Sequence, residues 1–310
     1  IWALTFQPLI SNFILTLGYW KTFNYKLKFK FDLEEVKKYS IFGKYILLST
    51  LIDSLFGRIN QIVIARVYNV KEVGLFSRAE STRDFPTALI SFIISSISFP
   101  LFCKVADDKK LRSNILLKML EMSYYISIPL VLYIFLLSKP IIVLLYGIKW
   151  ESVSEYLQII IFAIIFRLPT LVNFSFIKST GDSKSIFKTE LIQKIILLFS
   201  ILFTYNISIK ALIYGQLITI FITFLISSYF VYGMSKINVK IQLSKALKPL
   251  LASILLVLIV ICLLNIFQNI TYVNFTIISL ITFISYILIS KILKIESQKF
   301  LFNQINQIIK

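Results

Sequence analysis

The sequence predicts an all-α protein, a polytopic bundle of transmembrane helices, and its composition is the first reason. Of the 310 residues, 57% are hydrophobic and 15% are charged, whereas a soluble domain has about 25% charged residues. One core cannot bury so many apolar side chains, so most must face lipid or one another within the bilayer. The run Ile126–Leu137 is almost continuously apolar, which favours helices over the alternating strands of a membrane β-barrel.

The second reason is that apolar stretches of about 20 residues, the length that a bilayer requires, recur along the chain. The first one begins at Ile1 without an initiator methionine or a signal-peptide pattern, so we expect an N-terminally truncated fragment. The nine expected helical spans cover approximately residues 1–20, 40–65, 84–106, 114–138, 155–178, 186–208, 210–232, 247–267 and 272–291.

Basic residues give a predicted orientation. The chain carries 33 Lys and Arg against 15 Asp and Glu, a net charge of +18. Roughly three times as many Lys and Arg fall in the connections on one side of the nine spans as on the other. Because basic residues gather on the cytoplasmic side, we expect a cytoplasmic C-terminus. In a soluble protein this charge would indicate nucleic-acid binding, but topology explains it here, and we expect no nucleic-acid partner.

The sequence offers no residues for the common catalytic and metal-binding chemistries. It contains no histidine, which removes His-based metal sites and Ser-His-Asp or Cys-His catalysis. The two cysteines, Cys103 and Cys262, lie in apolar runs without ligand-like neighbours. The stretch Gly181-Asp-Ser-Lys-Ser lacks the spacing of a phosphate-binding loop. We therefore expect no catalytic residue, metal, cofactor or enzymatic activity.

Polar and small residues form a predicted stripe along the second span. Ser49, Asp53, Gly57 and Asn60 are spaced by four, four and three positions, which places them on one face of a helix. Asp53 falls near the centre of the span. Arg58 lies five residues further on, about 8 Å along the helix and rotated away, so these two charges are poorly placed to pair directly.

The fifth span carries another residue that is costly within a membrane, Arg167, two residues before Pro169. Such an arginine needs an acidic partner, a hydrated cavity or an anionic ligand, so Arg167 either pairs with Asp53 across helices or serves a cavity. Pro169 removes a backbone hydrogen bond and allows a kink or hinge. In the next span, Glu190 and Lys194 have the i, i+4 spacing of an intrahelical ion pair, which we favour over a cavity-lining role.

Several short strings between Arg58 and Lys184 together resemble one known family. They are Gly74-Leu-Phe-Ser-Arg-Ala79, Phe85-Pro86, Ser98-Phe-Pro-Leu-Phe102, Tyr146-Gly-Ile-Lys-Trp150 and Ser179-Thr-Gly-Asp-Ser183. The stretch is similar to the polysaccharide-unit flippases, the Wzx-type family that includes colanic and teichuronic acid exporters. The helix pattern on either side extends the resemblance to the rest of the chain.

The resemblance implies a two-lobe architecture. Such flippases belong to the multidrug/oligosaccharidyl-lipid/polysaccharide exporter superfamily, with typically fourteen helices in two six-helix lobes and a trailing pair. The nine spans here would then be helices 6–14. Residues 1–39 would hold the last helix of the N-terminal lobe and a cytoplasmic linker, residues 40–232 the C-terminal six-helix lobe, and residues 233–310 two additional helices and a cytoplasmic tail.

The resemblance also implies a function: alternating-access export of undecaprenyl-diphosphate-linked oligosaccharides across the bacterial cytoplasmic membrane. The product would be a surface polysaccharide such as O-antigen, capsule or exopolysaccharide, and the pathway's polymerase and glycosyltransferases are expected partners besides the bilayer. We expect Arg58 and Arg167 to bind the diphosphate, because a guanidinium matches phosphate in bidentate fashion. The residues expected to serve coupling or gating are Asp53, Asn60, Glu190, Lys194 and Pro169.

Two alternative functions remain. A multidrug or cation antiporter of the same superfamily would need membrane-embedded carboxylates, and Arg58 and Arg167 oppose Asp53 in that role. A membrane glycan polymerase or ligase would need a large external loop with catalytic side chains. The longest predicted external connection, residues 66–83, holds no histidine and only Glu72 and Glu80 as acids.

Overall fold

The computed structural model describes residues 2–23, 33–267 and 271–298. These residues form helices and no β-strand, which confirms the predicted all-α class. The chain divides into two compact units, Ile1–Ile41 and Phe42–Lys310. The first unit holds α1 (Trp2–Phe23) and the beginning of α2 (Leu33–Phe56). Side chains of α1 such as Leu9, Ile10 and Phe13 are exposed, as expected of a lipid-facing helix.

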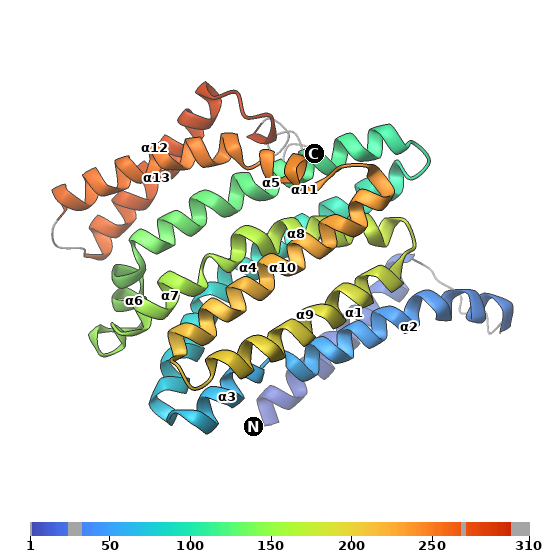
Figure 1. The fold of residues 1–310 in the computed structure, drawn as a ribbon, viewed down its shortest axis with the longest axis horizontal. Helices are drawn as coiled ribbons and strands as arrows, with labels where there is room; N and C mark the ends of the chain where they lie inside the picture. The colour runs from blue at the N-terminus through green and yellow to red at the C-terminus, as the bar shows by residue number, and fades with distance from the viewer. Residues whose placement is uncertain (1, 24–32, 268–270, 299–310) are drawn as a thin grey trace. The chain divides into compact units, whose positions relative to one another are not determined.

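The second unit contains the rest of α2 and all later helices (Figure 1). Those helices are α3 (Ile59–Val67), α4 (Val70–Lys104), α5 (Lys109–Leu136), α6 (Ser138–Tyr146), the 3-10 helix η1 (Ile148–Trp150), α7 (Val153–Ile160), α8 (Ala163–Ser179), α9 (Ser183–Thr204), α10 (Ile209–Ser235), α11 (Val239–Ser244), α12 (Leu247–Ile266) and α13 (Tyr272–Ile292).

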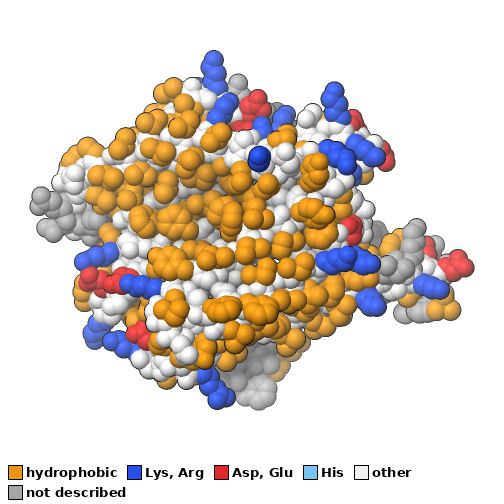
Figure 2. Space-filling model, viewed as in Figure 1, with side chains coloured by type: hydrophobic (Ala, Val, Ile, Leu, Met, Phe, Trp, Pro, Cys, Tyr) orange, Lys and Arg blue, Asp and Glu red, His pale blue; other side chains and the backbone are white. Residues whose placement is uncertain are grey.

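Membrane-spanning capacity follows from helix length and hydropathy. Among the described residues, seven helical segments are long and apolar enough to cross a bilayer, so the chain is a multi-pass membrane protein. The other two expected spans coincide with α1 and α9, each 22 residues long, and α9 carries Lys188, Glu190 and Lys194 within its length. On the face shown in Figure 2, hydrophobic side chains cover most of the surface and charged side chains gather towards its margins, as a bilayer requires. The seven segments are Phe42–Val67, Val70–Lys104, Lys109–Leu136, Val153–Ser179, Ile209–Ser235, Val239–Ile266 and Tyr272–Ile292.

Helix boundaries are set by local side-chain chemistry. The Asn69, Asp108 and Asp182 side chains accept hydrogen bonds from the first turns of α4, α5 and α9, whose backbone N–H groups have no partner within the helix. Gly147 and Gly181 have φ of 89° and 79°, a region that favours glycine, and they end the helices before η1 and α9. These two turns explain why glycine stands in the Tyr146–Trp150 and Ser179–Ser183 strings.

The prediction of an external loop at residues 66–83 is wrong. The helix α4 begins at Val70 and runs for 35 residues, so most of the expected loop is helical. The polar residues of this segment do not end the helix, because those facing inwards find partners: Glu80 accepts from Gln61, and Arg83 pairs with Asp84. The misassignment arose from treating charged residues as a connection between apolar spans.

The hydrophobic core centres on α8, which packs against α4, α5 and α10. Its Leu168, Val172 and Phe176 are fully or almost fully buried, and Phe176 meets Phe102 of α4 edge to face. The pair α12 and α13 has a separate apolar cluster and lies along α5 (Figure 1). A tyrosine on α13, Tyr286, donates to the Tyr125 carbonyl of α5 at 2.7 Å and ties this pair to the rest of the unit.

Candidate functional site: a charged cavity between six helices

A cavity of about 760 Å³ lies among α2, α3, α4, α8, α9 and α10, wholly within the second unit. Its wall holds five basic and four acidic side chains together with amide and hydroxyl groups. Such a wall is costly in a membrane protein unless water or a polar ligand fills the space. The ionisable residues of the wall are Asp53, Arg58, Glu80, Arg83, Asp84, Arg167, Lys178, Glu190 and Lys194.

The residues around the break between α2 and α3 place polar groups in the wall of this cavity. The helix α2 ends at Phe56 and α3 begins at Ile59. A Cβ on Gly57 would approach the Asp53 carbonyl oxygen to 3.0 Å, so the close approach of the backbone at this break favours glycine. Arg58 precedes α3 without capping it through its side chain, which leaves the guanidinium free to face the cavity.

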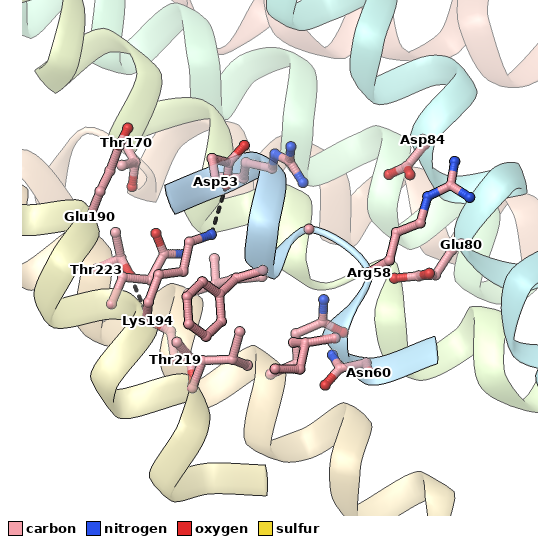
Figure 3. A pocket seen from close by; sticks show the side chains of 18 of the residues that line it. Asp53, Arg58, Asn60, Glu80, Asp84, Thr170, Glu190, Lys194, Thr219 and Thr223 are labelled. Atoms are coloured by element: carbon pink, nitrogen blue, oxygen red, sulfur yellow. Dashed lines mark hydrogen bonds and ion pairs between the residues drawn. The ribbon is translucent and has the colours of Figure 1, made fainter. Parts of the chain in front are cut away.

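Three of the four residues in the predicted stripe line the cavity. Asp53, Gly57 and Asn60 do so, whereas Ser49 is buried one turn before Asp53 and is not part of the wall. Figure 3 shows Arg58 on the same side of the cavity as Glu80 and Asp84, with Glu190, Lys194, Thr219 and Thr223 opposite. The prediction of one continuous helix face therefore holds only in part, because the helix is interrupted along the stripe and Ser49 lies outside the wall.

An ion pair joins α2 and α9 across the cavity wall. The Lys194 ammonium donates to the Asp53 carboxylate at 2.7 Å (Figure 3). The Lys194 side chain is 9% exposed and that of Asp53 is 73% exposed. The intrahelical pair expected between Glu190 and Lys194 is therefore wrong, and so is the alternative of Arg167 pairing with Asp53. A buried ammonium needs an acceptor within reach, and the neighbouring helix supplies one.

A second ionic cluster on α4 was not predicted. The Arg83 side chain is 5% exposed; its Nε and Nη2 donate to Asp84 Oδ1 at 2.9 and 2.7 Å, and Glu80 lies 3.7 Å away. Gln61 of α3 donates to Glu80 at 2.8 Å. Placing residues 66–83 in a loop concealed this cluster. The i, i+3, i+4 spacing of Glu80, Arg83 and Asp84 just before an apolar run is the signal that could have revealed it.

Other basic residues of the wall have no such partners. Within the described part of the chain, Arg58, Arg167 and Lys178 form no ion pair. The Arg167 side chain is exposed because it faces the cavity, although its helix, α8, lies at the centre of the core. Unpaired guanidinium groups around a hydrated space are suited to bind an anion, because each offers a planar fork of N–H donors.

The rest of the wall suits neutral polar ligands. The hydroxyls of Thr170, Thr219 and Thr223 donate to carbonyls of their own helices, so their oxygen lone pairs remain able to accept hydrogen bonds. Amide groups of Asn60 and Gln216 add further donors and acceptors. A ligand with many hydroxyls would therefore find both kinds of partner here.

Pro169 stands apart from the other predicted site residues. It is buried within α8 and does not line the cavity. The helix runs uninterrupted through it, while the break between α7 and α8 falls at Ile161 and Phe162. Six of the seven site residues predicted from the sequence therefore line one cavity, and Pro169 lies outside its wall.

The amino-acid sequence matches a known protein family. The model of a family described as "Polysaccharide biosynthesis protein" matches residues 1–155. The teichuronic acid biosynthesis protein TuaB of Bacillus subtilis is 25% identical over 244 residues, covering 75% of this chain and 49% of that protein. The lipopolysaccharide biosynthesis protein WzxC of Escherichia coli is 28% identical over 155 residues, covering 49% of this chain and 31% of that protein.

One solved structure has a similar fold. The structure of "Lipid II flippase MurJ, inward closed conformation" superposes with a TM-score of 0.66 at 18% identity, covering 86% of this chain and 56% of the flippase. This chain spans about half the length of TuaB.

Proposed function

We propose, since this chain belongs to the polysaccharide biosynthesis protein family, that it acts within a flippase for undecaprenyl-diphosphate-linked oligosaccharides. The flippase would move these units across the bacterial cytoplasmic membrane for the synthesis of O-antigen, capsule or exopolysaccharide. One observation carries the proposal: a membrane-embedded cavity has unpaired guanidinium groups and a wall rich in hydroxyls and amides.

The chemistry of such a substrate fits this wall. Its diphosphate is anionic, and Arg58 and Arg167 would bind it through charge-assisted, bidentate hydrogen bonds. Its sugars present hydroxyls, which the threonine and amide groups would meet. Its polyprenol tail is apolar and can stay in lipid. A membrane potential that is negative inside favours outward movement of an anion by about 2.3 kcal/mol per charge per 100 mV.

The architecture would work by alternating access. Residues 1–39 would be the last helix of a first lobe and its linker, residues 40–232 the second lobe, and residues 233–310 two additional helices and a cytoplasmic tail. The compact unit Phe42–Lys310 begins near the first of these boundaries, and α12 and α13 have their own apolar cluster beyond the second. The nine spans would be helices 6–14 of fourteen, and the polymerase and glycosyltransferases of the pathway would be partners.

The Asp53–Lys194 pair supports a coupling role. It joins the helix before the α2–α3 break to α9, so its formation or loss would change how two walls of the cavity are held together. Glu190 lies one turn before Lys194 and Asn60 lies just after the break, so both are placed to respond to that change. We propose these residues as the coupling or gating group, with Pro169 holding the part of α8 that carries Arg167.

One observation favours a second candidate, a multidrug exporter for cations. Four carboxylates line the cavity where the sequence predicted one central acid. Three of them, however, already meet a basic side chain: Asp53 meets Lys194, and Glu80 and Asp84 meet Arg83. The basic residues left without partners outnumber the remaining acid, so the anionic substrate remains the proposal that the charges support better.

The test is complementation of a strain that lacks its polysaccharide flippase, with the full-length gene and with Arg58→Ala and Arg167→Ala variants. Loss of one bidentate guanidinium contact, about 1.5–3 kcal/mol, should lower surface polymer about tenfold or more. Arg66→Ala is the control, because Arg66 is an exposed arginine of α3 outside the cavity wall. Normal polymer in both variants at matched protein levels would contradict the anion-binding role. Drug resistance without polymer would favour the second candidate.

A further inference from the structure

A second pocket, of about 610 Å³, lies between α7 and α10 with the end of α5 as its third wall. Its volume is within the range of small-molecule sites. The Glu155 carboxylate and the Lys210 ammonium, 2.7 Å apart, line it together with apolar and aromatic residues. Phe135 of α5 and Phe162 form an edge-to-face pair, with ring centroids 5.5 Å apart, in this lining.

The pocket is separate from the charged cavity. On α10, its lining residues Lys210, Tyr214 and Leu217 follow the i, i+4, i+7 spacing of one helix face. The cavity uses Gln216, Thr219 and Thr223 of the same helix, which lie on another face. Because α10 divides the two spaces, a ligand in the second pocket would not occupy the transport path.

Polarity changes in the same direction along both helices that flank the pocket. Along α7 the lining becomes less polar from Glu155 through Gln158 to Ile159, and then to Phe162 at the junction with α8. Along α10 it does so from Lys210 through Tyr214 to Leu217. Each series covers seven positions, about 10 Å at the rise of an α-helix. Charges therefore lie at the end of the bundle where both helices begin, and the apolar wall extends towards the membrane interior.

This gradient matches the profile of a membrane lipid, and the two charges indicate its headgroup. We propose that the pocket binds phosphatidylethanolamine, with its phosphate on Lys210 and its ammonium on Glu155. The headgroup carries both charges, and the ammonium supplies N–H donors to the carboxylate. Phosphatidylglycerol would bring its negative charge to Glu155 without a compensating cation. Phosphatidylcholine has no N–H donor for the carboxylate.

The existing ion pair does not obstruct this ligand. The side chains of Lys210 and Glu155 are 51% and 62% exposed, and ion pairs at that exposure contribute little stability, so a headgroup can replace their mutual contact. Below them, the Phe135–Phe162 pair and Leu217 offer an apolar wall to the glycerol backbone and the first part of an acyl chain. The site is independent of the proposed transport function.

The experiment is native mass spectrometry of the delipidated full-length protein with added phosphatidylethanolamine, phosphatidylglycerol or phosphatidylcholine. The wild-type protein should retain phosphatidylethanolamine in preference to both others. Glu155→Gln should reduce that preference about threefold or more, and Lys210→Gln should reduce the retention of phosphatidylethanolamine itself about threefold or more, as expected when one charge-assisted hydrogen bond is lost. Glu155→Gln should also raise the relative binding of phosphatidylglycerol, because it removes the repulsion. Leu217→Trp should displace the lipid with both charges intact.

A matched control is available in the Lys139–Glu151 pair. It is also exposed, with 2.6 Å between its charged atoms, and it lines neither pocket. Lys139→Gln and Glu151→Gln should leave lipid retention unchanged. Equal retention of the three lipids, or equal losses in the control variants, would overturn the proposal. Displacement by polyprenyl phosphate with sensitivity to Lys210→Gln but not to Glu155→Gln would also overturn it, since the occupant would then be the lipid carrier.

Discussion

The Asp53–Lys194 ion pair should respond very differently to removal of its two partners. The Lys194 side chain is 9% exposed, whereas that of Asp53 is 73% exposed. Asp53→Ala leaves an ammonium group with little access to water and without its acceptor, which should cost about 1–3 kcal/mol of unfolding free energy. Lys194→Met leaves a carboxylate that solvent can reach and keeps an apolar stem in the buried position. It should cost less than about 1 kcal/mol.

The assay is unfolding of the purified protein in mixed micelles, followed for both single variants and the double variant. The double variant should be more stable than Asp53→Ala, because it removes the buried charge, and the coupling free energy should be about 0.5–3 kcal/mol. Lys139→Met in the exposed Lys139–Glu151 pair is the control and should be close to neutral. Greater destabilisation by Lys194→Met than by Asp53→Ala, or additive effects in the double variant, would refute the burial argument.

Two further predictions concern helix packing in the same unit. A methyl group at Gly215 would overlap the Ser200 hydroxyl, so Gly215→Ala should destabilise the α9–α10 contact by about 1–3 kcal/mol, and Ser200→Ala in the same protein should restore most of the loss. Asn173 is fully buried and donates at 3.1 Å to Ser227 and to Gln242, so Asn173→Ala should cost about 1–3 kcal/mol. Thermal unfolding tests both, and unchanged midpoints would contradict them.

The sequence predicted the helices well because a bilayer imposes a simple rule on the chain. Each membrane-crossing segment needs about 20 mostly apolar residues, so composition alone locates the segment centres. The ends were harder to predict, since a charged residue can continue a helix when its partner lies on another one. The helix α4 shows this: Asn69 caps its start, and Glu80 within it accepts a hydrogen bond from Gln61 of α3.

Within the site, the sequence predicted which residues face inwards but not how they pair. The spacing of Asp53 and Asn60 placed both on one helix face, and both line the cavity. The partner of Lys194 depended on which helix stands beside α9, and a spacing rule within one helix cannot supply that information. The i, i+4 relation to Glu190 was a valid local option, but Asp53 of α2 lies 2.7 Å away.

The ion pairs within the cavity, rather than the number of charges, indicate which of its arginines can bind an anion. Arg83 has two of its N–H groups on Asp84 and a second acid close by, so an incoming anion would compete with carboxylates that are already bound. Arg58 and Arg167 form no ion pair among the described residues, so their N–H donors are not already bound to a carboxylate and can bind a phosphate. An anion crossing this lobe should therefore contact Arg58 and Arg167, while Arg83 stays paired with Asp84 on α4.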